Sequence, residues 1–242
     1  MSKPDPIVVA RNFVASKYSD CQVAFVAGSF NRGEATSTSD IDLIVLFSKV
    51  EHASRESLIY QGWPIEVFIH DLETIKYFFN DDAKSGIPSL ANMINEGVVI
   101  EEKLNYSDEV KALAKSVLNH GPPVLSEEER TNFRYSISDL LDDLKDPRTI
   151  FEGYAITAKL HGILSFFLFR SQGQWAGAGK HIPRQLQKKN PVLFIAWEKA
   201  FTEAFLGHFN LVIQLTEKIL LENGGYLFDG YKLDAPKEWR IK

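Results

Sequence analysis

Two aspartates separated by one residue carry the strongest chemical signal in the sequence. Asp40 and Asp42 stand at the start of an apolar run that continues to Phe47 and has the length of a β-strand. Side chains two positions apart on a strand project to the same face, so we expect the two carboxylates to lie side by side. Neighbouring carboxylates repel each other unless a cation lies between them, and oxygen ligands of this kind suit Mg²⁺. The pair therefore predicts a magnesium site with both aspartates as ligands.

A Gly-Ser pair precedes the aspartates and ends another apolar run, Val23 to Ala27. Gly28 lets the backbone approach a ligand closely, and Ser29 adds a hydroxyl, so both residues are candidates for binding phosphate oxygens. Arg32, in the loop that follows, is a candidate for further positive charge on the phosphates; a solvated loop arginine is the alternative. Because Mg²⁺ is commonly bound by one or two carboxylates together with the phosphates of a substrate, the motifs predict a site for a substrate that carries phosphates.

The order strand, Gly28-Ser29, a loop containing Arg32, the sequence Ser-Asp-Ile-Asp and a second strand resembles the DNA polymerase β-like nucleotidyltransferase superfamily. The similarity is closest to the bacterial branch that modifies small molecules, such as the aminoglycoside nucleotidyltransferases. By motif it covers the first part of the chain; over the second half it is limited to the presence of a helical domain. The resemblance implies attack by a hydroxyl on the α-phosphate of a nucleoside triphosphate, with pyrophosphate as the leaving group.

Glu66 is a charged residue within the otherwise apolar segment 64–70, which alternates as a strand does. On this pattern Glu66 faces away from Ile65 and Val67, and a surface residue on an edge strand is one interpretation. The resemblance implies another, in which Glu66 is the third carboxylate beside Asp40 and Asp42. In that place it either completes the metal site or accepts the proton of the attacking hydroxyl.

The second half of the chain offers a further candidate for nucleotide binding. Lys180 directly follows the glycine-rich segment 173–179. This segment lacks the spacing of a Walker loop. The resemblance implies that a lysine of the second domain reaches the nucleotide, which makes Lys180 a candidate. Trp175, in the same segment, is a candidate for stacking on a base or an acceptor. The acidic residues Asp139, Asp142, Asp143 and Asp146 indicate a solvated helix face, or else an anionic wall for a cationic acceptor.

These residues must be positioned by an α+β domain. Asp5-Pro6 predicts the start of a helix that continues towards Tyr18. The remaining elements expected in this part are strands at 21–27, 40–47 and 64–70, helices at 71–79, 87–96 and 108–119, and a short strand at 98–100, with a polar break at Asn80-Asp81-Asp82.

Pro122-Pro123 is the predicted boundary, with a nucleotidyltransferase catalytic domain at 1–121 and a helical domain at 122–242. The first is expected to contain a mixed β-sheet with flanking helices, and the second a helical bundle. Ser126 and Glu129 form a capping-box pattern at the start of a helix that ends near Lys145. Further helices are predicted at 149–170, from Asn190-Pro191 to about 206, and ending at Glu222.

Composition limits the class of partner. The 242 residues include 45% hydrophobic and 24% charged residues, and the net charge is −5. A mildly acidic protein lacks a general attraction for nucleic-acid phosphates, so nucleic acid is not an expected partner. Cys21 has no second cysteine to pair with and is expected to be a buried, inert thiol. The apolar runs are too short to span a bilayer, so we expect no membrane partner and a cytoplasmic protein.

The sequence therefore predicts a Mg²⁺-dependent transferase that moves AMP from ATP to a hydroxyl of a small-molecule acceptor. Two alternatives stay open. The acceptor could be a protein or RNA partner, or the chain could be a nucleotide-binding sensor of the same fold without turnover. The sequence leaves the acceptor, the base preference and the oligomeric state open, and a homodimer is compatible with it.

Overall fold

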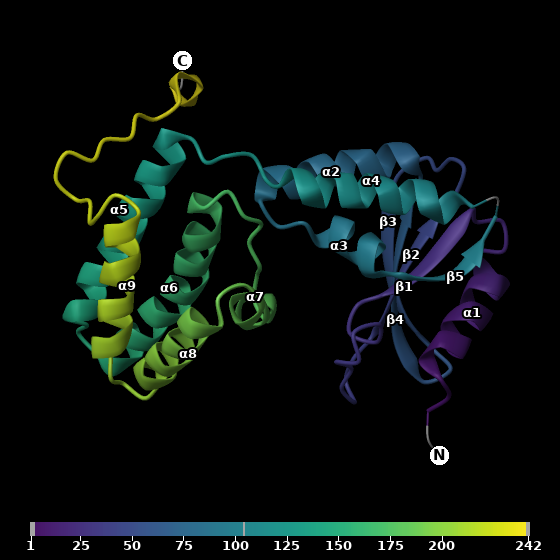
Figure 1. Ribbon diagram of the computed structural model, residues 1–242, viewed down its shortest axis with the longest axis horizontal. Coiled ribbons are helices and arrows are strands. Elements are labelled where there is room, and N and C mark those ends of the chain that lie inside the picture. The colour runs from purple at the N-terminus through teal and green to yellow at the C-terminus, as the bar shows by residue number, and fades with distance from the viewer. Residues whose placement is uncertain (1–2, 104, 241–242) are drawn as a thin grey trace. The chain divides into compact units, whose positions relative to one another are not determined.

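A computed structural model describes residues 3–103 and 105–240 of the chain (Figure 1). The chain divides into two compact units, Met1–Pro122 and Pro123–Lys242. The first unit combines a β-sheet with helices and the second is helical, which confirms the predicted α+β fold class. Among the described residues, no helix is both long and apolar enough to cross a membrane.

The first unit is built on a five-stranded sheet with the strand order β3-β4-β2-β1-β5. β2 and β4 are parallel, and the other neighbours are antiparallel, so the sheet is mixed as predicted. The strands are β1 (Val23–Ala27), β2 (Ile41–Leu46), β3 (Ser54–Tyr60), β4 (Trp63–His70) and β5 (Val98–Glu102). The segments expected as strands from the sequence correspond to β1, β2, β4 and β5.

The sequence analysis missed β3. This edge strand exposes every second side chain, and it includes Arg55 and Glu56, so it lacks the continuous apolar run of the buried strands. It pairs with β4 through a hairpin in which Gln61 and Gly62 both adopt positive φ. Two central residues at positive φ match the twist of a two-residue β-hairpin. The Gln-Gly pair before the strand at 64–70 is the sequence signal that could have revealed β3.

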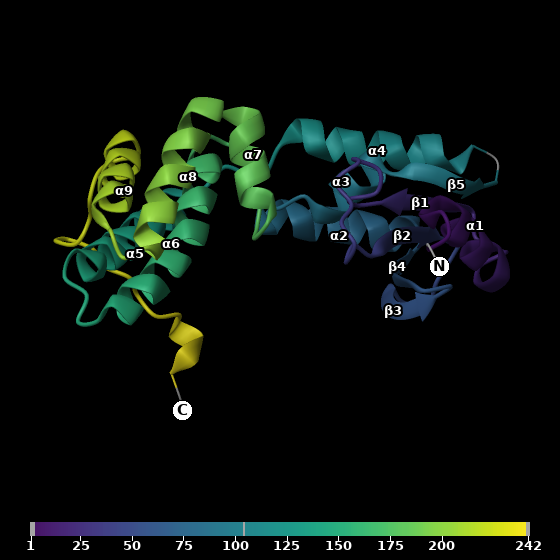
Figure 2. The ribbon, with the colours of Figure 1, turned by 90° about the horizontal axis from the view of Figure 1, so that it is seen from below.

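Helices cover both faces of the sheet, as Figures 1 and 2 show. α1 (Pro6–Lys17), capped by Asp5 as predicted, packs on the face that carries Leu43 and Val45. The opposite face, which carries Ile44, packs against α2 (Leu72–Ser85), α3 (Ser89–Glu96) and α4 (Tyr106–His120). Strands buried on both faces read as continuous apolar runs, so a charged residue within one of them needs a separate explanation.

The polar break predicted at residues 80–82 is wrong, because α2 continues to Ser85. The helix ends at Gly86, which adopts the left-handed conformation that favours glycine. Asp82 lies within the last turns, and its carboxylate accepts hydrogen bonds from the backbone N–H groups of Leu90, at 2.8 Å, and Ala91, at 3.4 Å. Asp82 therefore links α2 to α3. Burial raises the pKa of its carboxyl group.

The helical unit begins with the predicted capping box, in which Ser126 and Glu129 bind each other's backbone N–H groups. Trp197 is buried in the core of this unit. α7 was not predicted as a separate helix. The helices are α5 (Glu127–Lys145), α6 (Ile150–Ser171), α7 (His181–Lys189), α8 (Pro191–Phe205) and α9 (Asn210–Glu222), with a short 3-10 helix at Lys237–Trp239.

Cys21 is fully buried just before β1. Burial raises the pKa of its thiol to about 11, so the thiolate form is disfavoured at neutral pH. This confirms the expectation of a buried, inert thiol.

Asp71 links the end of β4 to α2 and to the segment after β2. Its carboxylate accepts the N–H of Thr74 at 2.8 Å and the N–H of Val50 at 2.9 Å, and the side chain is almost completely buried. Burial by itself raises the pKa of Asp71, but the hydrogen bonds from Thr74 and Val50 lower it more, to below its ordinary value of 3.8. The charged carboxylate therefore stabilises the folded state.

We predict that Asp71→Ala lowers the free energy of unfolding by about 1–3 kcal/mol at pH 7, because a helix cap and a buried hydrogen bond are both lost. The contribution of a carboxylate with a lowered folded pKa is complete above the unfolded value of 3.8 and is lost as the pH falls through the folded value. Urea unfolding from pH 7 to pH 3 should show the difference between wild type and variant shrinking below about pH 4. A difference that stays constant over this range would contradict the assignment. Asp5→Ala, at the exposed cap of α1, is the control and should cost less.

Candidate active site

Three carboxylates gather at one end of the sheet. Asp40, Asp42 and Glu66 each offer one oxygen, and these oxygens lie within 4.8 Å of one another. All three residues are half-buried. An acidic set with this spacing suits a hard divalent cation with oxygen ligands, so the donor set fits Mg²⁺.

The pairing of β2 with β4 brings these residues together. The two strands are parallel, and Asp42 pairs in register with Glu66. Asp40 lies two residues before Asp42, immediately ahead of the strand. One step further along the same face, Ile44 pairs with Phe68 and packs towards α2, α3 and α4. In β2, the site is therefore the polar end of a face that continues with the buried apolar residues Ile44 and Leu46.

Gly28 forms the side of the site next to Asp42. It directly follows β1, in which Ala27 pairs with Asp42, and it has a φ of +77°. A Cβ atom at this position would lie 2.0 Å from Oδ2 of Asp42. Both the conformation and the close approach therefore require glycine here.

The loop after Gly28 is fixed by hydrogen bonds. The carbonyl of Ser29 accepts the N–H of Glu34 at 3.0 Å, and the side-chain amide of Asn31 donates to the carbonyls of Val26 and Glu96. Ser29 is half-buried beside Gly28. Sequence reasoning did not identify Asn31, whose contacts lie outside its own loop and leave no local pattern.

Arg32 is engaged by two acidic side chains. Its guanidinium lies 3.0 Å from the carboxylate of Glu34 and 3.3 Å from that of Glu96. Arg32 is nevertheless exposed, so the alternative of a loop arginine without a role at the nucleotide stays open. To bind a phosphate it would have to exchange these partners, and its role at the nucleotide stays a prediction.

Glu66 has two partners on the missed strand β3. Arg55 Nη2 donates to Glu66 Oε1, and Ser57 Oγ donates to the same oxygen at 3.2 Å. The guanidinium of Arg55 also lies over the ring of Phe68, 5.2 Å from its centroid. Neither partner was predicted, because the contacts depend on a strand pairing that the sequence analysis did not recognise.

A small pocket adjoins the carboxylates on the β3–β4 hairpin. It has a volume of about 280 Å³. Asp40, Ser57 and Glu66 supply its polar groups, and the rest of its lining comes from Leu58, Ile59, Pro64 and Ile65. The pocket thus combines an acidic end with an apolar wall, and its size is close to the lower limit for small-molecule sites.

Lys180 and Trp175 belong to the helical unit. Lys180 is exposed and immediately precedes α7. Trp175 is half-buried, and its backbone carbonyl accepts a hydrogen bond from the side-chain amide of Gln185. The roles predicted for Lys180 and Trp175 stay predictions. In the acidic run on α5, Asp142 bonds to the hydroxyl of Tyr226 and lies 3.6 Å from Lys145.

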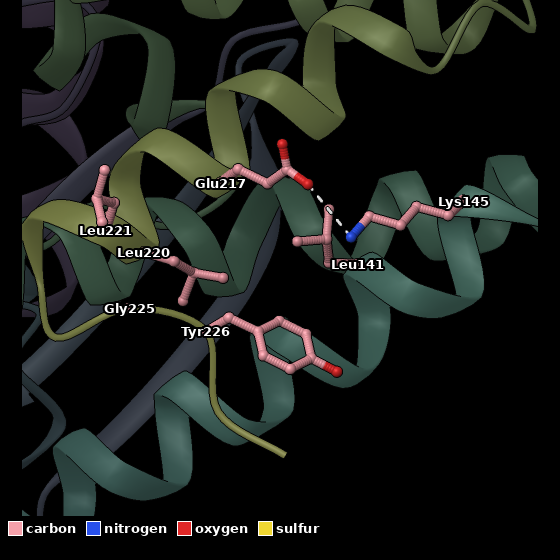
Figure 3. Close-up of a pocket in the computed structure, with 7 residues that line it drawn as sticks. All are labelled: Leu141, Lys145, Glu217, Leu220, Leu221, Gly225 and Tyr226. Carbon is pink, nitrogen blue, oxygen red and sulfur yellow. Dashed lines mark ion pairs between the residues drawn. The ribbon is translucent and has the colours of Figure 1, made fainter. Parts of the chain in front are cut away.

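The helical unit has a pocket of its own, with a volume of about 320 Å³ (Figure 3). Figure 3 shows Lys145 and Glu217 pointing towards each other, and their charged groups form an ion pair of 3.2 Å. The remaining lining residues are Leu141, Leu220, Leu221, Gly225 and Tyr226. A mostly apolar lining whose two charged side chains neutralise each other does not suit a triphosphate.

His70 is the last residue of β4 and is buried. Burial lowers the pKa of its imidazole to about 4, so the ring is neutral at pH 7. Its Nδ1 lies 3.3 Å from the hydroxyl of Thr74.

Part of the first unit matches a known protein family. Residues 12–106 match the family model described as polymerase beta, nucleotidyltransferase. The matched segment includes Gly28, Ser29, Asp40, Asp42 and Glu66. This match supports the superfamily that the sequence motifs resemble. It also supports a general function in nucleotidyl transfer. The aminoglycoside branch stays a prediction.

Two further comparisons extend beyond this domain. No curated protein matches the chain. Among solved structures, the chain is similar to a nucleotidyltransferase-like protein from Exiguobacterium sibiricum 255-15, with 15% sequence identity and a TM-score of 0.41. The similarity covers 91% of this chain and 77% of that protein.

We predict that Gly28→Ala disrupts the carboxylate site, because the added methyl group would displace the side chain of Asp42. Gly33→Ala is a matched control: Gly33 also has a positive φ, of +67°, but an added Cβ would meet nothing within 4 Å. Both variants should lose about 1–2 kcal/mol of stability from backbone strain. Titration with Mn²⁺ should show affinity reduced by about tenfold or more in Gly28→Ala alone. Equal Mn²⁺ affinity in the two variants would contradict the role of Gly28.

Proposed function

We propose that the protein is a divalent-metal-dependent nucleotidyltransferase that transfers AMP from ATP to a hydroxyl of a small molecule. The observation that carries the proposal is the convergence of Asp40, Asp42 and Glu66 beside Gly28, within a domain that matches nucleotidyltransferases. A cluster of acidic residues that is only solvated would not require a glycine packed against one of its carboxylates. A site for a metal bound to phosphates needs both features.

Each residue has a part in binding the reactants. Asp40 and Asp42 would hold Mg²⁺, with Glu66 as the candidate third ligand. When bound there, Mg²⁺ supplies charge neutralisation at the phosphates. Gly28 and Ser29 offer a backbone N–H and a hydroxyl to the terminal phosphates. Additional positive charge for the nucleotide would come from Arg32 and Lys180.

The proposed reaction is a single displacement at the α-phosphorus. The acceptor oxygen forms a bond to this phosphorus, and the bond from the phosphorus to the oxygen that bridges to the β-phosphate breaks. Pyrophosphate leaves with the electrons of that bond. Glu66 accepts the proton of the acceptor hydroxyl if it acts as the base, and orients the reactants if it is only a ligand.

The pocket beside Glu66 supports a small acceptor. Its volume of about 280 Å³ is suited to a small molecule or to part of one, and Glu66 and Asp40 lie in its lining. A hydroxyl bound in this pocket would be close to both the candidate base and the metal ligands. The net charge of −5 does not favour an RNA acceptor.

We predict that Asp40→Ala and Asp42→Ala each reduce transfer by about 100-fold or more, since metal stabilisation of the transition state is worth several kcal/mol. Pyrophosphate release should be measured with ATP, Mg²⁺ and a panel of small hydroxyl acceptors. Asp108→Ala, which removes an exposed acid from α4, is the control and should leave the rate unchanged. Wild-type turnover in either site variant would remove the metal assignment.

We predict that Glu66→Gln slows transfer more than it weakens nucleotide binding. If Glu66 is the base, the turnover rate should fall by about 100-fold to 10,000-fold while Mn²⁺ affinity changes little. If Glu66 is a ligand, Mn²⁺ affinity should fall together with the rate. Rate constants and Mn²⁺ titrations on the same preparation separate the two roles. A variant with the wild-type rate would exclude both.

A further inference from the structure

We propose that Arg55 and Ser57 are positioning residues that hold the carboxylate of Glu66 in its working orientation. Both donate to Oε1, so neither of these two hydrogen bonds occupies Oε2. The inference rests on the proposed function, because it assumes that Glu66 acts as a metal ligand or as the base. It adds the edge strand β3 to the site, although neither residue belongs to the metal-ligand group.

Strand pairing places both donors on the face of the sheet that carries Glu66. Ser57 is the partner of Glu66 in the β3–β4 register, and Arg55 is the partner of Phe68. Cross-strand partners share a face, and residues two apart on one strand do so as well. Arg55 therefore reaches Glu66 diagonally, with its guanidinium over the ring of Phe68.

Glu66 needs external support to stay near the aspartates. Three carboxylates with oxygens within 4.8 Å repel one another, and a glutamate side chain has several rotatable bonds through which it could turn away. The positive charge of Arg55 offsets part of the repulsion, and two donors on one oxygen restrict rotation of the carboxylate.

A role in stability explains these contacts less well than a role in orientation. The Arg55 side chain is 62% exposed, whereas that of Glu66 is only 16% exposed. Ion pairs with an exposed partner contribute little to stability. Lys17 forms an exposed ion pair with Glu56, which pairs with Val67 and therefore lies on the opposite face of the sheet from the three carboxylates.

The test uses substitutions that leave the net charge unchanged. Ser57→Ala removes the hydroxyl donor, and Arg55→Lys keeps the positive charge but removes the planar guanidinium. Ser54→Ala on the same strand and Arg11→Lys on α1 are matched controls. Ser57→Thr restores a hydroxyl and should rescue the function. Full-length proteins are titrated with Mn²⁺ in the absence of nucleotide, and the turnover number and KM for ATP are then measured at saturating Mg²⁺.

For either role of Glu66, we expect Ser57→Ala and Arg55→Lys to lower the turnover number by about 10–100-fold, while the KM for ATP stays within about twofold and both controls and Ser57→Thr match wild type. If Glu66 is a metal ligand, Mn²⁺ affinity should fall by a similar factor. If Glu66 is the base, Mn²⁺ affinity should stay near the wild-type value. A loss of melting temperature without a change in turnover number or Mn²⁺ affinity would indicate a structural role and overturn the inference.

The outcome also separates this inference from the proposed function. If wild type binds Mn²⁺ and both variants keep the wild-type Mn²⁺ affinity and the wild-type turnover number, the positioning role is wrong while the metal site stands. If wild type itself binds no Mn²⁺, the proposed metal site fails, and the inference fails with it.

Discussion

The parallel register between β2 and β4 is the constraint on which the site depends, because it places Glu66 opposite Asp42. Side chains alternate along a strand, so a slip of one residue would move Glu66 to the face packed against α1. The apolar pairs further along fix this register, since Ile44 and Phe68 must both face α2–α4. Burial of the core and assembly of the acidic site are therefore set by the same pairing.

The sequence was sufficient to place the candidate site residues that stand beside an apolar strand. Asp40, Asp42 and Gly28 lie next to apolar strands, and their spacing alone indicates their faces and their chemistry. Glu66 depended on the family resemblance, because nothing local shows which strand pairs with β2. Arg55 and Ser57 could not be predicted, since an amphipathic edge strand lacks the apolar run that identifies buried strands.

Boundaries of elements were predictable where a specific side chain caps a helix. Asp5 and Ser126 begin helices as their patterns indicate. The polar segment at Asp82 misled the analysis because its carboxylate binds backbone N–H groups of the next helix, a tertiary contact that composition does not reveal. Division into catalytic and helical domains that fold independently remains a proposal, as does the contribution of Lys180 from the helical unit.

The most direct test of the central claim is nucleotide binding measured by thermal shift. ATP, GTP, CTP and UTP are each added with and without Mg²⁺ to wild type and to Asp42→Ala. A ligand that binds only the folded state raises the melting temperature, so a nucleotide site built around Asp42 predicts a Mg²⁺-dependent rise that is absent in the variant, with the largest shift for ATP. No shift with any nucleotide at millimolar concentration, or the same shift in both proteins, would contradict a metal-dependent nucleotide site at these carboxylates.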